Sequence, residues 1–298
     1  MTTRIITDST AYLPKEVVER HDIEVVPLHV VVGGKDYVEG RDISAAQVAA
    51  ALRDYTIVTT SRPTPQVFAE TYRRLVDEGA TGIASIHLSS QMSGTVEAAR
   101  LAAAEVSVPV EVVDSETIGM AMGFAVVAAA ESAAAGADLP TVVEAVHERL
   151  GPSGVLFYVD TLEHLRRGGR IGAASALLGS ALAIKPILAV RAGRIVPVEK
   201  VRTSSRAVAR IEAMVLEQVT KGGHVVDLAV HHLDAPARAE QIAAELRELV
   251  PGPPEVLVVE LGAVVGAHVG PGTVAIAVSP RPGEPLPETP APGEASGS

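Results

Sequence analysis

The sequence predicts an α/β protein built from two domains, and two observations carry this prediction. Short apolar runs at 4–7, 83–87 and 110–113 alternate with segments of helical periodicity, which is the pattern of βαβ crossovers and a largely parallel sheet. At 298 residues the chain also exceeds the usual size of one domain, so two domains or one large α/β unit are expected.

A domain junction is predicted at 151–154, where Gly-Pro-Ser-Gly interrupts this alternation. The expected organisation is an N-terminal α/β domain at 1–153 and a C-terminal α/β domain at 154–280. Residues 281–298 consist mainly of Pro, Gly, Glu and Ser with a single Leu, which cannot bury enough surface to fold. A disordered tail is therefore expected there.

The composition limits the classes of function. Hydrophobic residues make up 47% of the chain, but with three Phe and no Trp the core must be aliphatic, and base-stacking surfaces for nucleic acid are not expected. The absence of cysteine excludes disulfides, thiolate catalysis and Cys-ligated zinc, and a net charge of −11 argues against a nucleic-acid partner. Because no basic-then-apolar leader follows Met1 and the apolar run 120–130 is too short to span a bilayer, a cytoplasmic protein is expected.

In the first half, periodicity and turn residues predict each element. A strand at 4–7 and a helix from Pro14 to Arg20 precede the β-branched run 23–32, which Gly33-Gly34 should fold back onto a strand at 35–38 as a hairpin. Ser44 is a suitable N-cap for the next helix. The further predicted elements are that helix to Leu52, a strand at 57–60, a helix at 66–78, the strands 83–87 and 110–113, and helices at 118–135 and 139–150.

Strands and helices also alternate in the second half. A strand at 155–159 and a short helix at 161–165 lead to Arg-Arg-Gly-Gly-Arg at 166–170, a turn able to bring guanidinium and N–H groups onto one oxyanion. The glycine-rich segment 263–273 is expected to be a connection. The remaining predicted elements are a small-residue helix at 173–183, a hairpin of strands 185–191 and 194–201, a helix at 204–220, a strand at 225–231, a helix at 235–250, and strands at 255–261 and 274–278.

Two strand-to-helix turns carry hydroxyl groups that suit an anion. Unpaired N–H groups at a helix start carry partial positive charge and bind anions. The hydroxyl groups are those of Ser89, Ser90, Ser93 and Thr95 in one turn and of Thr59, Thr60, Ser61 and Thr64 in the other. Taken singly, each cluster is better explained by structure alone: helix capping by Ser93 in the first turn and ordinary turn chemistry in the second.

One segment is basic in this acidic protein. Between Arg166 and Arg210, ten Lys or Arg residues accompany one acid, Glu199. Such a segment is either a solvated face that is balanced by neighbours in space or a surface for phosphate or an acidic partner.

The sequence contains no familiar catalytic constellation. Ser93 and His268 would suit a hydrolase, but the G-x-S-x-G elbow is absent around Ser93. His231 and His232 are adjacent on a predicted strand, so they should point to opposite faces and are expected to be ordinary strand residues rather than metal ligands. No glycine-rich nucleotide loop opens a helix. Anion recognition without evident catalytic machinery remains.

Eight short motifs follow one another over about residues 4–280. They are ITDSTAYLP at 6–14, TTSRPTP at 59–65, SSQMSGT at 89–95, VVDS at 112–115, LRRGGRI at 165–171, KPIL at 185–188, KVRT at 200–203 and HVGPGT at 268–273. Together they resemble the DegV family, bacterial fatty-acid-binding proteins that act as the binding subunit of fatty acid kinase.

The resemblance implies a two-domain DegV-like fold, with a largely parallel N-terminal sheet, a mixed C-terminal sheet and one long-chain fatty acid in a tunnel between them. Aliphatic side chains would line the tunnel. By motif, the residues that hold the carboxylate would be Thr60, Ser61, Ser93, Gly94 and His268. Arg170 and Arg202 would face the phosphate or the partner. Where the family commonly has Gln, this chain has Arg62.

The implied partners are a long-chain fatty acid and a separate ATP-dependent kinase subunit that forms an acyl phosphate for phospholipid synthesis. The chain itself would be no enzyme and would need no metal or cofactor besides the bound acid, and transient contact with the membrane is compatible with this role. A passive lipid carrier or sensor is the second interpretation. A stand-alone phosphotransferase or hydrolase of a small anionic substrate is the third.

Overall fold

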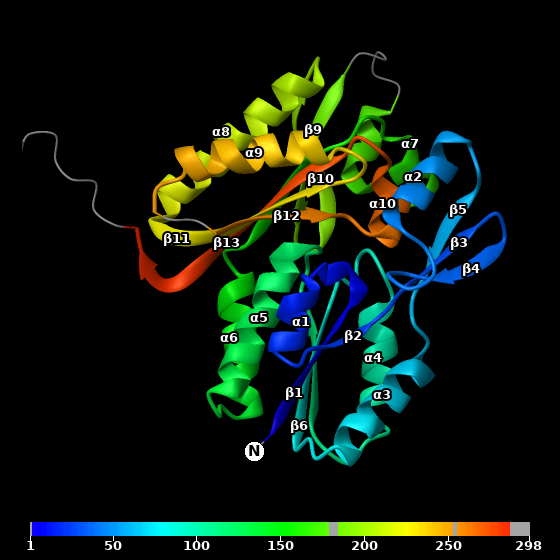
Figure 1. The fold of residues 1–298 in the computed structure, drawn as a ribbon, viewed down its shortest axis with the longest axis vertical. Coiled ribbons are helices and arrows are strands. Elements are labelled where there is room, and N and C mark those ends of the chain that lie inside the picture. The colour runs from blue at the N-terminus through cyan, green and yellow to red at the C-terminus, as the bar shows by residue number, and fades with distance from the viewer. Residues whose placement is uncertain (1, 179–183, 253–254, 287–298) are drawn as a thin grey trace, which may run out of the picture.

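The computed structural model describes residues 2–178, 184–252 and 255–286. Two α/β halves are stacked on one another, and a small three-stranded lobe lies beside their junction (Figure 1). The N-terminal half contains a parallel sheet of strands in the order β2-β1-β6-β7, namely β1 (Thr3–Asp8), β2 (Glu24–Val26), β6 (Gly82–His87) and β7 (Val110–Asp114). The predicted parallel sheet is therefore confirmed.

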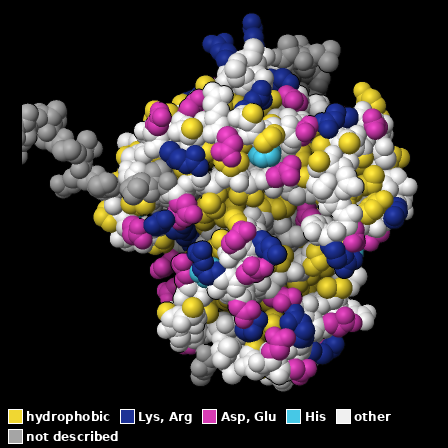
Figure 2. Space-filling model, viewed as in Figure 1, with side chains coloured by type: hydrophobic (Ala, Val, Ile, Leu, Met, Phe, Trp, Pro, Cys, Tyr) yellow, Lys and Arg dark blue, Asp and Glu magenta, His cyan; other side chains and the backbone are white. Residues whose placement is uncertain are grey.

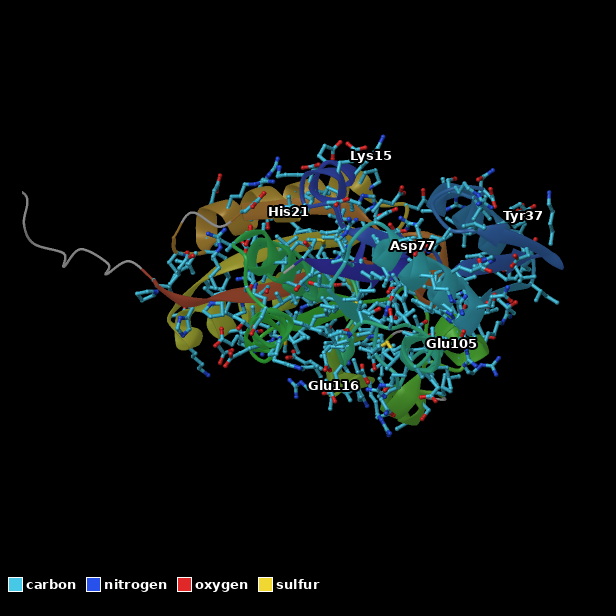
Figure 3. All side chains as sticks on the ribbon, turned by 90° about the horizontal axis from the view of Figure 1, so that it is seen from below. Lys15, His21, Tyr37, Asp77, Glu105 and Glu116 are labelled. Carbon is cyan, nitrogen blue, oxygen red and sulfur yellow. The ribbon has the colours of Figure 1, made fainter. Side chains whose placement is uncertain are left out.

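Helices cover both faces of this sheet. Helices α5 (Met120–Ala134) and α6 (Leu139–Leu150) pack on one face, and α3 (Pro65–Asp77) and α4 (Thr95–Ala103) pack on the other (Figure 1). Seen from below, Lys15 and His21 at α1 (Lys15–Arg20), which leads into β2, and Glu116 after β7 lie at the two opposite edges of the sheet (Figure 3). Strand β6 is buried along its whole length because it lies between two neighbouring strands and two helical layers.

The small lobe contains β3 (His29–Val32), β4 (Lys35–Val38), β5 (Val58–Ser61) and helix α2 (Ala45–Arg53). The single strand predicted at 23–32 is wrong: Val26 pairs in the parallel sheet, whereas His29 already pairs in the lobe. Pro27 lies between them and lacks the N–H that a continuous ladder requires. The hairpin turn at Gly33-Gly34 is confirmed, and Ser44 caps α2 in a capping box with Gln47.

The second half contains a mixed sheet in the order β10-β9-β8-β13-β11-β12, in which β11 and β12 run parallel and the other pairs are antiparallel. Helices α8 (Ser204–Gly222) and α9 (Pro236–Leu249) cover its outer face, and its inner face is turned toward α5 and the first half (Figure 1). The strands are β8 (Gly154–Tyr158), β9 (Lys185–Arg191), β10 (Arg194–Val201), β11 (His224–His232), β12 (Glu255–Glu260) and β13 (Val274–Pro285).

Three predictions in this half are corrected. The expected connection at 263–273 contains a helix, α10 (Ala263–Val269), and the helix expected from 173 is a 3-10 helix at Gly172–Leu177 that follows α7 (Glu163–Arg167), with 179–183 outside the described residues. Strand β13 continues to Pro285, because Arg281 is held by Asp227 and Pro285 pairs with His224. The first residues of the predicted tail are thus part of the sheet, and 287–298 lie outside the described residues.

The two halves share one cluster of the hydrophobic core. One buried cluster joins Met120 and Phe124 of α5 to Val155, Phe157 and other residues of the second sheet. Helix α10, late in the sequence, packs against the small lobe formed early in it. None of the helices in the described part of the chain combines the length and the hydropathy needed to cross a membrane. The shared cluster and the contacts of α10 hold the two halves together. The domain boundary at residue 153 stays a prediction.

Candidate functional site

A cavity lies between the carboxyl ends of the first sheet and the inner face of the second. Its wall is mostly apolar; the first half contributes Leu28, Leu88 and Ile118, and the second contributes Val155, Phe157, Leu165, Val190, Ile195 and Ala275. The expectation of purely aliphatic walls is wrong, since Phe157 and Tyr12 are also part of the wall.

Alternation along the strands explains which side chains reach the cavity. Val155 and Phe157 are two residues apart on β8, and Thr273 and Ala275 are two apart at the start of β13. Side chains at this spacing share one face of a sheet. The outer face of the same strands packs against α8.

One part of the wall is polar and contains five of the predicted site residues: Thr60, Ser61, Ser93, Arg170 and His268. Thr60, on β5 of the small lobe, places its Oγ1 atom 2.8 Å from Nε2 of His268, on α10. The other ring nitrogen of His268, Nδ1, is buried and has no hydrogen-bond partner among the described residues. The TTSRP and HVGPGT motifs therefore meet at this point.

The start of helix α4 forms another part of the polar wall. Ser93 lines the cavity, and its Oγ is 2.9 Å from Oγ1 of Thr95. The N-cap is Gly94, which no side chain caps, so capping by Ser93 is wrong. Gly94 itself is not among the residues that line the cavity; a Cβ at this position would collide with the guanidinium of Arg62, which lies across the helix start.

Arg170 connects this helix start to the glycine pair of the RRGGR turn. Its Nε donates to the carbonyl oxygen of Met92 at 3.0 Å, and its Nη1 donates to that of Gly168 at 2.6 Å. Gly168 in turn lies directly against the imidazole of His268, so that a Cβ there would collide with Nδ1. The turn thus brings a cation and the histidine together, and it requires glycine for the close approach.

The electrostatics of the cavity favour an anion. Its described lining residues include Arg62 and Arg170, but no Asp or Glu. Burial, and secondly the charge of Arg170, lower the pKa of His268 to about 4. At neutral pH the imidazole is therefore an uncharged hydrogen-bonding group, and the arginines supply the positive charge.

Sequence reasoning missed two further residues of the wall. Tyr12 and His231 both line the cavity, with ring centroids 6.2 Å apart in an edge-on arrangement. The backbone N–H of Met120, at the start of α5, donates to Nε2 of His231 at 3.0 Å, and burial lowers the pKa of this histidine to about 4. His232, the next residue on β11, does not line the cavity, because neighbouring side chains on a strand point to opposite faces. This alternation was the one signal in the sequence that could have indicated His231.

Arg202 is not part of this cavity. It lines a separate surface hollow with Lys200, Arg206 and Arg210, where Arg210 pairs with Glu199 at 2.7 Å. Elsewhere in the basic segment the balancing neighbours are present: Arg166 and Arg167 pair with Glu163, and Lys185 pairs with Asp160. On one face of the molecule, acidic and basic side chains are interspersed and a band of hydrophobic side chains runs between the two halves (Figure 2).

The described residues contain no group of three or more His, Cys, Asp or Glu side chains that could hold a metal ion.

A family profile described as "Uncharacterised protein, DegV family" matches residues 2–281. The chain belongs to the DegV family.

DegV relatives match over nearly their whole length. A DegV domain-containing protein of Streptomyces coelicolor is 54% identical over 277 residues, which are 93% of this chain and 98% of the relative. A solved structure of a DegV family protein of Thermus thermophilus is described as showing fatty acid binding. It superposes on this chain with a TM-score of 0.86 at 34% identity, and the match covers 94% of this chain and 100% of the Thermus chain. DegV of Bacillus subtilis, described as a fatty acid binding protein, gives 0.87 at 34% identity with the same coverage.

Proposed function

We propose that this DegV protein binds a long-chain fatty acid between its two halves and presents the carboxylate to a separate ATP-dependent kinase subunit. The acyl phosphate formed would feed phospholipid synthesis. Thr60, Ser61, Ser93, Gly94 and His268 would hold the carboxylate, and Arg170 and Arg202 would face the phosphate or the kinase. The protein is proposed to act in the cytoplasm, without catalytic activity of its own.

The observation that carries the proposal is the composition of the cavity wall. A mostly apolar wall ends in hydroxyl groups, two guanidinium groups and a neutral histidine, with no carboxylate among the described lining residues. That arrangement is complementary to an amphipathic monoanion. The fatty acid binding described for two solved relatives of 34% identity supports the same ligand class.

The energetics suit this ligand. Burial of each methylene contributes about 0.8 kcal/mol, so a chain of about 16 carbons supplies most of the binding energy. A buried carboxylate costs several kcal/mol unless it accepts hydrogen bonds, and the hydroxyl groups and the free N–H groups at the start of α4 are such donors.

The first experiment is native mass spectrometry of the protein purified from a bacterial host, followed by organic extraction. A co-purified C14–C18 fatty acid at one molecule per chain is expected. A homogeneous, folded protein that carries no lipid and does not take up added hexadecanoic acid would contradict the proposal.

A second experiment separates the proposed carrier from its alternatives. Acyl phosphate should form only when ATP and a kinase subunit are both added. Binding without phosphorylation would favour a passive carrier or sensor, whereas turnover by this chain alone would favour a phosphotransferase or hydrolase. Because Arg202 lies outside the cavity, Arg202→Ala should leave the retention of fatty acid unchanged and slow only the phosphorylation step.

A further inference from the structure

Helix α10 presents one face to the cavity, and this face includes His268. Val264, Val265, His268 and Val269 all line the cavity, at a spacing that places them on one side of a helix. With seven residues the helix is too short to be stable without support. The contacts at its ends therefore decide where the imidazole of His268 lies.

The start of α10 is held by side chains from the first half of the chain. Its N-cap, Gly262, supplies no capping side chain. Instead, the backbone N–H of Val264 donates to Oε1 of Glu39 at 2.7 Å, and that of Val265 donates to the hydroxyl oxygen of Tyr12 at 3.2 Å. Two of the N–H groups that a helix start leaves free are thus satisfied from another part of the fold.

Glu39 is itself firmly held. It follows β4, has 6% of its surface exposed, and its second carboxylate oxygen accepts a hydrogen bond from the hydroxyl of Ser9. The Tyr12 hydroxyl donates to Oε1 at 3.4 Å. A Cβ at Gly262 would collide with Oε1 of Glu39 and with the ring of Tyr12, so glycine is required for this close approach.

We propose that Glu39 is a positioning residue of the carboxylate site. By accepting from Val264 at the start of α10, it places His268 against Thr60 and so sets the geometry in which the fatty acid head group is bound. Glu39 lines a neighbouring cavity rather than the fatty acid cavity, so it acts through the helix and not by contact with the ligand. This inference rests on the proposed function.

The test compares the binding of hexadecanoic acid with that of hexadecanol, which has the same chain and an uncharged head group. Glu39→Ala should weaken binding of the acid by about tenfold and binding of the alcohol much less. Glu39→Gln should restore most of the loss, because the amide oxygen still accepts from Val264. Tyr12→Phe, which keeps the ring, should give a smaller loss in the same direction, and Glu19→Ala on the exposed α1 is the control.

Two further measurements separate positioning from general destabilisation. In protein labelled with 13C-histidine, the NMR resonance of His268 should shift in Glu39→Ala and return toward wild type in Glu39→Gln. In a His268→Ala background, Glu39→Ala should cause no further loss of acid binding.

The inference is overturned if wild type binds the acid but Glu39→Ala binds it equally well. It is also overturned if Glu39→Ala weakens the binding of the acid and of the alcohol equally, or if Glu39→Gln weakens the binding of the acid as much as Glu39→Ala does. Full additivity of the losses in acid binding caused by Glu39→Ala and His268→Ala would overturn it as well. Failure of the wild-type protein to bind hexadecanoic acid would instead contradict the proposed function.

Discussion

Thr60 and His268 are 208 positions apart in the chain, yet Oγ1 of Thr60 lies 2.8 Å from Nε2 of His268. Thr60 lies on β5, an edge strand of the small lobe, and His268 lies on α10, between β12 and β13. This pair joins the two motifs at the polar end of the cavity. It therefore offers a direct way to test the proposed carboxylate site.

Thr60→Val removes the hydroxyl and keeps the shape of the side chain. We expect affinity for hexadecanoic acid to fall about three- to tenfold, as for the loss of one hydrogen bond, with little change in thermal stability. Displacement of a fluorescent fatty acid measures this. Thr59→Val is the matched control, because the side chain of Thr59 is exposed and does not line the cavity. Equal losses of affinity in the two variants would argue against a role for Thr60.

Gly168→Ala should disrupt the site without unfolding the protein. The new Cβ would collide with Nδ1 of His268, so the imidazole must move away from Thr60 and acid binding should fall by at least tenfold. Gly222→Ala is the control: a Cβ there meets no atom within 4 Å, at the end of α8. Wild-type binding by Gly168→Ala would show that the position of His268 is unimportant.

The titration of His268 should reveal its surroundings. Burial and then the charge of Arg170 lower its pKa to about 4, so NMR should find it neutral at pH 6. Arg170→Ala should raise this pKa, since a nearby cation no longer opposes protonation, but burial should keep it below about 6.5. A lowered folded pKa means that the unfolded state binds the proton more readily, so this group removes stability as pH falls from about 6.5 to 4. A normal pKa for His268 in the wild type would contradict this account.

Asp227 is expected to stabilise the contact between the halves. Its carboxylate pairs with the buried Arg149 of α6 and with Arg281 of β13. Asp227→Ala should lower the free energy of unfolding by about 3–5 kcal/mol, because Arg149 is left buried without a counterion. Urea unfolding measures this, and Asp36→Ala, in an exposed pair with His29, should change stability by less than about 0.5 kcal/mol. A loss for Asp227→Ala as small as that for Asp36→Ala would rule out this role.

Local sequence determined much of the secondary structure. Alternation and helical periodicity predicted β1, β6 and β7 of the parallel sheet, Ser44 predicted the start of α2, and the runs at 185–191 and 194–201 predicted the hairpin of β9 and β10. The motifs also indicated the family to which the chain belongs. Such features depend on interactions within a few residues, or on patterns that can be matched along the chain.

Only the tertiary structure decided which side chains meet. It places Tyr12 and His231 in the cavity wall, leaves Arg202 on a separate surface, and connects Glu39 to the helix that carries His268. No local pattern could indicate these relationships, because they depend on how the two sheets and the small lobe pack. Spacing along a strand or helix predicts which face a side chain occupies, but the partner opposite that face is set by elements more than 200 positions away.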